Sequence, residues 1–286
     1  MTSEPENTDS RGSLRRPATF AAALVAIVLI VVTGAIVLIG RHSGSDPEAA
    51  KTSSPTTAAP TTAPASSATG FTTPDVDPFG RRVDVPANPA GQPLEQTAPQ
   101  RRPDDPQWLT AAPAGTRGPD AKGGWQRVHG AVVPFSTSDG PTHIQDGVPV
   151  GYAHTPQGAA LAAAFVMWQT RARLGDRPLR EHMVVMSAAD FAQFDRLKAQ
   201  GKAPDTQPEQ VTRYMVAPDA FRITSWSDDM CQVALAVRQG SDTGAPRWTG
   251  LTLAMVWDQN EWKLRLPADK MIPQQTVTSI GGWTAW

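Results

Sequence analysis

One uninterrupted apolar run near the N-terminus constrains this chain more than any other feature. Residues 20–40 read FAAALVAIVLIVVTGAIVLIG and include no charged side chain. At about 1.5 Å of rise per residue, a helix of this length spans the ~30 Å hydrocarbon layer of a bilayer. A buried core helix fits less well, because the run has no polar face. We therefore predict a transmembrane helix over residues 19–40.

A cleavable signal peptide is the alternative for this run. Such peptides have an apolar core of roughly 7–15 residues and then a cleavage site of small residues. Here the run is longer, and Arg41-His42-Ser43-Gly44 follow it. We expect the helix to stay uncleaved as a single-pass anchor in the cell membrane. Residues 1–18 are then a cytoplasmic tail, and the C-terminal part of the chain is extracellular. The flanking basic residues show only a slight bias, so the next segment supplies the better argument for this orientation.

The segment that follows, residues 41–124, is rich in Pro, Ser, Thr and Ala. From Ser43 to about Gly70 it has almost no large apolar side chain, so it cannot bury enough surface to offset the entropy of ordering. Ser/Thr tracts with Pro are typical of O-glycosylated stalks outside the cytoplasm, and an unmodified flexible linker has the same composition. Prolines continue from Phe71 to about Gly124, where we expect an extended and mostly irregular chain. We predict a disordered stalk over residues 41–124.

Large apolar residues return at regular spacings from Trp125, where the predicted folded domain, residues 125–286, begins. About 160 residues is a comfortable size for one hydrophobic core. This stretch has fifteen Lys and Arg residues against fifteen Asp and Glu residues. Proteins that bind nucleic acids need a basic stripe for the phosphates, so we expect no nucleic-acid partner.

Signals for helices come first in this domain. Thr155 and Pro156 suit the cap and the first position of a helix, and the apolar stripe after them is spaced by three and four residues. Its alanines are expected to pack closely on the sheet. A second helix is predicted after Ser187, where Asp190 completes a capping box. A third, short helix is predicted over residues 208–215.

After the helices the apolar period changes from about 3.6 to 2, which predicts strands. The last two strands form a hairpin around residues 258–260, and the tail with Trp283 and Trp286 is expected to fold back. The fold class is therefore α+β, with helices packed on a curved, roughly four-stranded antiparallel sheet in a cone-like arrangement. The predicted strands lie around residues 221–225, 231–238, 251–257 and 262–266.

The sequence offers few residues for chemistry. His154 precedes the first helix and is either an acid/base or anion contact, or a turn histidine bonded to the backbone. The second interpretation is favoured, because no titratable partner is near in sequence. Cys231 alternates with apolar residues and is expected to be buried, and the histidines lack the spacing of metal ligands. We expect no catalytic residue, no cofactor and no metal site. The candidate interaction residues are Tyr152, His154, Thr155 and Pro156.

The motif around these residues resembles a known family. Residues 146–159 read DGVPVGYAHTPQGA, and Gly140-Pro141-Thr142 precede them. This pattern resembles an uncharacterised family of actinobacterial single-pass membrane proteins, often encoded on integrative and conjugative elements, and the resemblance covers residues 125–286. The order of helices and strands is also similar to the nuclear-transport-factor-like cone fold. Membrane-anchored domains of that fold serve as scaffold subunits in type IV secretion and Gram-positive conjugation machines, and the resemblance implies such a role here.

Two functions follow as expectations. The first is a non-catalytic, membrane-anchored domain that scaffolds a cell-envelope or conjugative transfer assembly. Its partners are the lipid bilayer, through residues 19–40, envelope or secretion-machine proteins, and further copies of itself. The alternative is a ligand-binding or enzymatic cone with a pocket between helix and sheet. A core filled by Trp168, Trp257 and Trp262 favours the first. An enclosed cavity with convergent polar groups and a perturbed titratable residue favours the second.

Overall fold

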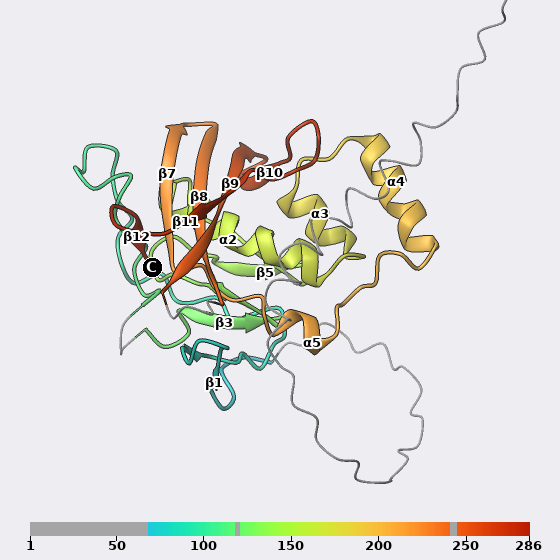
Figure 1. Cartoon of the computed structure of the whole chain (residues 1–286), viewed down its shortest axis with the longest axis horizontal. Helices are drawn as coiled ribbons and strands as arrows, with labels where there is room; N and C mark the ends of the chain where they lie inside the picture. The colour runs from blue at the N-terminus through green and yellow to red at the C-terminus, as the bar shows by residue number, and fades with distance from the viewer. Residues whose placement is uncertain (1–67, 118–120, 241–244) are drawn as a thin grey trace, which may run out of the picture.

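The computed structural model describes residues 68–117, 121–240 and 245–286 (Figure 1). The predicted transmembrane helix and the first part of the predicted stalk lie outside the described residues. None of the helices in the described ranges is long and apolar enough to cross a membrane. The described part is an α+β structure, as predicted, and it combines helices with antiparallel strands.

The elements alternate along the chain more than the sequence suggested. The helices are α2 (Pro156–Ala172), α3 (Arg177–Met183), α4 (Ala188–Ala199) and α5 (Glu209–Thr212). The strands are β1 (Asp75–Val76), β2 (Arg82–Val83), β3 (Trp125–Val128), β4 (Ala131–Pro134), β5 (His143–Gln145), β6 (Val148–Val150), β7 (Ala220–Ser227), β8 (Met230–Gln239), β9 (Arg247–Asp258), β10 (Glu261–Arg265), β11 (Gln274–Val277) and β12 (Thr284–Ala285).

A six-stranded antiparallel sheet forms one wall of the domain. Its strand order is β10-β9-β8-β7-β12, and β11 also pairs with β9. The predicted hairpin is β9–β10, and its turn residues Gln259 and Asn260 have φ values of 53° and 61°. Two successive left-handed residues match the right-handed twist of the flanking strands, which is why this two-residue turn closes the hairpin. The predicted tail also folds back, because β12 pairs with β7 and Trp286 is buried.

Helix α2 lies in the middle of the domain and is enclosed on all sides (Figure 1). It packs against the large sheet on one side and against the β3–β4 hairpin on the other. Of its 17 residues, only Thr170 and Arg171 are not buried. The alanines of α2 are fully buried, so their small side chains let the walls approach closely, as predicted.

The two predicted helix starts are confirmed. Thr155 caps α2 by accepting a hydrogen bond from the Gly158 amide at 3.0 Å, and Pro156 follows it. Ser187 and Asp190 form the predicted capping box of α4. At Gly158 a side chain has no room, since a Cβ atom would lie 2.0 Å from the backbone oxygen of Ala153. Local signals therefore place both helix N-termini correctly.

The second part of the predicted stalk packs onto the domain, which differs from the expectation. Most of residues 68–117 is irregular in secondary structure, as predicted, yet Val83 is fully buried in a cluster with Val132 and Ala217. The buried Asp84 carboxylate accepts a hydrogen bond from the Gly123 amide at 2.7 Å. Such tertiary partners order a Pro-rich chain that has little apolar surface of its own. The packed unit therefore begins before Trp125, the predicted boundary.

Asp219 holds the N-terminal segment, residues 68–117, against the sheet through Arg81. Its carboxylate accepts hydrogen bonds from Arg81 at 2.5 Å, from Arg238 at 2.7 Å and from the Trp248 indole N–H at 2.7 Å. The Arg81 guanidinium also lies over the ring of Trp125, 4.5 Å from its centroid. Because the Asp219 side chain is only 7% exposed, these charged bonds are shielded from solvent.

Candidate interaction site at the N-terminus of α2

Thr155 and Pro156 belong to a buried junction and do not reach the surface. Thr155 Oγ1 donates a hydrogen bond to Asp139 Oδ1 at 2.6 Å, and Ser138 Oγ donates to the other carboxylate oxygen. Asp139 is 2% exposed, and its burial raises the pKa of the carboxyl. Ser136 Oγ accepts the amides of Ser138 and Asp139. This network fixes the loop before β5 to the start of α2, which is a structural role.

Tyr152 is also an interior residue. Its side chain is 2% exposed, and its ring packs against Phe165 with 6.2 Å between centroids. Burial raises the pKa of the phenol, and the negative charge of Glu261 adds to the rise. Within the described ranges the Tyr152 hydroxyl has no hydrogen-bond partner. A neutral, buried phenol is not available to a protein partner in this conformation.

His154 is the one candidate of the four that lies at the surface. Its ring stacks on the indole of Trp257, with 4.1 Å between centroids and 10° between planes. Its Nε2 atom hydrogen-bonds the backbone oxygen of Asp228. His154 is therefore a surface histidine bonded to the backbone, which is the geometry that the favoured interpretation expects. The structure adds an aromatic environment that sequence reasoning missed.

Five rings form an aromatic cluster at this end of the sheet, made of Trp108, His154, Trp226, Trp257 and Trp262. Trp262 is fully buried at its base and donates its indole N–H to the backbone oxygen of Ala153 at 2.9 Å. Trp226 and Trp257 lie 5.6 Å and 5.2 Å from Trp262, and Trp108 lies 5.6 Å from Trp226. The cluster therefore runs from the core to the surface.

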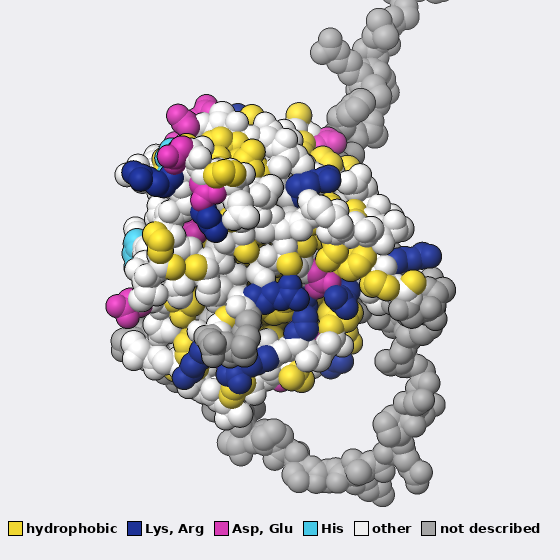
Figure 2. Space-filling view, turned by 90° about the vertical axis from the view of Figure 1, so that its left-hand side faces the viewer, with side chains coloured by type: hydrophobic (Ala, Val, Ile, Leu, Met, Phe, Trp, Pro, Cys, Tyr) yellow, Lys and Arg dark blue, Asp and Glu magenta, His cyan; other side chains and the backbone are white. Residues whose placement is uncertain are grey.

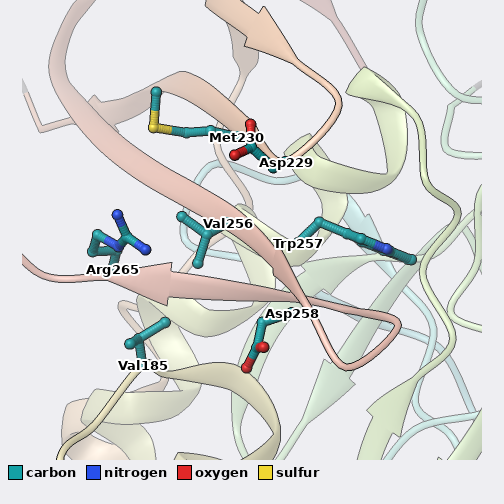
Figure 3. A pocket seen from close by; sticks show the side chains of 7 residues that line it. All are labelled: Val185, Asp229, Met230, Val256, Trp257, Asp258 and Arg265. Atoms are coloured by element: carbon teal, nitrogen blue, oxygen red, sulfur yellow. The ribbon is translucent and has the colours of Figure 1, made fainter.

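A half-open hollow of about 350 Å³ lies beside the cluster (Figure 3). Its lining combines apolar and charged side chains, but the Trp257 ring extends away from the other lining side chains. Asp229 accepts a hydrogen bond from Ser227 at 2.8 Å, and Asp258 pairs with Lys263 at 3.2 Å. Both carboxylates thus have partners already. The lining residues are Val185, Asp229, Met230, Val256, Trp257, Asp258 and Arg265.

A second polar group lies around Glu261, at the start of β10. Its carboxylate accepts a hydrogen bond from the Gly151 amide at 3.2 Å. Partial burial raises the pKa of this carboxyl, while the Gly151 hydrogen bond and the positive charges of His182, His143 and Lys263 lower it. The fold thus brings His143 and His182, which are far apart in sequence, close to the Glu261 carboxylate. Across the described ranges, however, no group of three or more His, Cys, Asp and Glu side chains is arranged to hold a metal ion.

Cys231 is buried, as predicted. Its position on β8 points it into the core, and burial raises the pKa of the thiol to about 12. Since the thiolate is the reactive form of cysteine, this residue is inert at neutral pH.

His129 is a partly buried titratable group at the β3–β4 turn. Its backbone is left-handed, with φ 44°, and its amide donates to the backbone oxygen of Pro89 at 3.0 Å. Burial and the positive charge of Arg173 lower the pKa of its imidazole to about 4. Nε2 is enclosed and has no hydrogen-bond partner among the described residues. The folded domain therefore holds His129 neutral.

We predict that this histidine makes the domain acid-sensitive. An imidazole with a folded pKa of about 4 and an ordinary value of 6.5 favours folding above pH 6.5, and this contribution is lost as the pH falls towards 4. Between pH 7 and 4.5 the wild-type protein should lose about 2 kcal/mol through His129. His129→Asn should not lose it, and asparagine tolerates the left-handed backbone.

Urea denaturation of both proteins at the two pH values measures the difference. Asp139 and Glu261 have raised pKa values, so their contribution to the free energy of unfolding increases as the pH falls, opposite to that of His129. They contribute equally to wild type and variant, so they do not affect the comparison. Parallel pH profiles for wild type and variant would contradict the assignment to His129.

The comparison with known families agrees with the extent of the packed unit. The family model described as "Domain of unknown function (DUF8175)" matches residues 84–285. Neither a curated protein nor a solved structure matches the chain. The match begins before Trp125 and thus includes part of the N-terminal segment that packs on the sheet. The chain therefore belongs to the DUF8175 family.

Proposed function

We propose that this chain is a membrane-anchored, extracytoplasmic interaction domain that scaffolds a cell-envelope assembly. The observation that carries the proposal is the filled interior. A ligand-binding cone keeps its pocket between helix and sheet. Here Trp262 and Trp168 belong to the hydrophobic core in which α2 packs on the sheet, whereas Trp257 is only partly buried against that core. Trp262 is fully buried, and Trp168 is 7% exposed with its indole N–H bonded to the Val216 oxygen at 2.7 Å. Such a domain acts through its surface.

The aromatic cluster supplies a contact surface of the required kind. Aromatic side chains are enriched in the cores of protein interfaces, where they bury large area at low entropic cost. His154 is exposed, and Trp226 and Trp257 are partly exposed beside it. The rigid base of Trp262 holds these rings in place, so a partner would meet a preorganised patch.

The anchor and its spacer complete the proposal. The apolar run over residues 20–40 suits a single-pass helix, and residues 41–67 separate it from the first described residue. A spacer of this length that stays unfolded, as its composition predicts, would reach about 30 Å and hold the domain away from the lipid. The motif in residues 146–159 resembles proteins of integrative and conjugative elements, which supports conjugative transfer as the process that the assembly serves.

A photo-crosslinking amino acid at position 154 in the full chain, expressed in its native host, tests the scaffold role. The matched control carries the same group at Gln200, which is exposed at the end of α4 and distant in sequence. We expect crosslinks to an envelope protein from position 154 and none from position 200. Recovery of the chain alone from both positions would overturn the scaffold role.

The anchor is tested separately in intact cells. We expect added protease to cut the spacer and the mature protein to retain residues 19–40. A domain that stays uncut while surface controls are digested, or a mature N-terminus after residue 40, would overturn the anchored, extracytoplasmic arrangement.

The ligand-binding alternative depends on the half-open hollow beside β9. Its Asp229, Asp258 and Arg265 could recognise a small charged molecule, but two of the three already have partners within the protein. The filled interior therefore favours the scaffold over the ligand-binding domain.

A further inference from the structure

The half-open hollow beside β9 has an apolar floor on the outer face of the large sheet. Val256, which is 6% exposed, pairs with Met230 of β8 on one side and with Lys263 of β10 on the other. Residues paired across strands share a face, and Met255, the chain neighbour of Val256, packs in the core. The hollow is therefore on the side of the sheet away from α2, separate from the helix–sheet interior.

One end of the hollow has a cation without a partner. Arg265 is exposed and forms no hydrogen bond or ion pair with any described residue. Lys263, two positions away on the same face, already binds Asp258 at 3.2 Å and Gln259 at 3.0 Å. Arg265 is thus the lining cation that remains for a ligand. A guanidinium suits a carboxylate, because it can donate two parallel hydrogen bonds to it.

The other end has a carboxylate whose charge is not compensated. Asp229 is exposed, and the Ser227 hydroxyl donates to its Oδ1 at 2.8 Å, while Oδ2 has no partner in the described ranges. Figure 3 shows Arg265 on one side of Val256, with Asp229 and Asp258 on the other. Figure 2, viewed from the side of β7, also shows acidic side chains among hydrophobic ones towards the top, which is where the β7–β8 turn lies in Figure 1.

We propose that this hollow binds a short zwitterionic peptide, with its carboxylate on Arg265 and its ammonium on Asp229. In the sheet these two residues are two strands and about three positions apart, so their Cα atoms are about 14 Å apart. The two side chains cover part of this distance and leave a gap for an extended peptide of about two or three residues. Small apolar side chains of the peptide lie on Val256 and Met230. The volume of about 350 Å³ is at the lower end for ligand sites, which suits so small a ligand.

The arrangement of charges distinguishes between classes of ligand. A simple anion would meet the two carboxylates, and a simple cation would meet Arg265, whereas a zwitterion compensates both ends. Because the charged lining side chains are exposed, water competes with the ligand, and we expect a dissociation constant of about 1 mM for trialanine with free ends. The inference does not depend on the membrane anchor or on the scaffold role.

Methyl NMR of the full chain in detergent, labelled at methionine, tests the site through Met230, which lines the hollow. We expect trialanine to shift the Met230 methyl signal and to leave that of Met167, buried on α2, unchanged. N-acetyl-trialanine and trialanine amide each lack one charge, so each should bind about fivefold more weakly. An unshifted Met230 signal, or equal binding of the three peptides, would overturn the proposal.

Removing charges from the protein tests the two contacts separately. Arg265→Gln should abolish the preference for trialanine over its amide, and Asp229→Asn should abolish the preference over the acetylated form. Asparagine at position 229 still accepts the Ser227 hydroxyl, so the turn keeps this hydrogen bond. Arg196→Gln, at an exposed position on α4 without an ion pair among the described residues, is the matched control and should bind like the wild type. Circular dichroism confirms that each variant is folded. Variants at positions 265 and 229 that keep the full preferences would contradict the assignment.

Discussion

Replacing Trp262 by alanine should lower the free energy of unfolding by about 3–5 kcal/mol. The indole is fully buried, so the change removes its apolar contacts and leaves a cavity at the base of the aromatic cluster. It also leaves the Ala153 backbone oxygen without the 2.9 Å hydrogen bond from the indole N–H. Urea denaturation at pH 7 measures the loss.

A control and a second readout make this result specific. Leu109→Ala removes an apolar side chain that is 38% exposed, and it should change stability by less than about 0.5 kcal/mol. Because the rings of His154, Trp226 and Trp257 rest on Trp262, near-ultraviolet circular dichroism of the cluster should also weaken. A loss below about 1 kcal/mol would mean that Trp262 is not the base of the cluster.

Replacing Asp219 by alanine should cost about 3 kcal/mol, because it leaves two arginines and one indole N–H without their shared acceptor. The carboxylate is 7% exposed, whereas Arg81 and Arg238 are 19% and 37% exposed, so water compensates the loss only in part. Denaturation midpoints measure the cost. Limited proteolysis should also cut the N-terminal segment near Arg81 sooner in the variant than in the wild type.

Asp228→Ala is the matched control for this change. Its side chain is exposed and has no ion pair among the described residues, so its removal should leave monomer stability within about 0.5 kcal/mol. Equal effects at both aspartates would show that the charge network around Asp219 does not hold the N-terminal segment in place.

The sequence predicted those parts of the fold that depend on local signals. The Thr155 cap, the capping box at Ser187 and the β9–β10 hairpin all follow from side chains a few residues apart. The short helix α3 was missed because its seven residues are too few for a clear apolar period. Hairpins β3–β4 and β5–β6 were missed for the same reason, since their strands have four and three residues.

The long-range features could not be predicted from spacing. The order of residues 68–117 depends on partners such as Asp219, which is 138 positions from Arg81. The aromatic cluster joins rings from the N-terminal segment, β7, β9 and β10, and no motif connects Trp108 with Trp226. Of the four candidate interaction residues, Tyr152, Thr155 and Pro156 proved to be buried, because the motif that contains them builds the junction before α2.

The enclosure of α2 determines how the domain can form. The β3–β4 hairpin, on one side of this helix, precedes it in the chain, and the strands of the large sheet, on its other side, follow it. Most stabilising contacts therefore join positions that are distant in sequence. A nascent chain that has reached only α4 would present an alanine-rich helix without its second wall. High contact order of this kind slows folding. The domain should therefore reach its folded state only once β7–β10 have been synthesised.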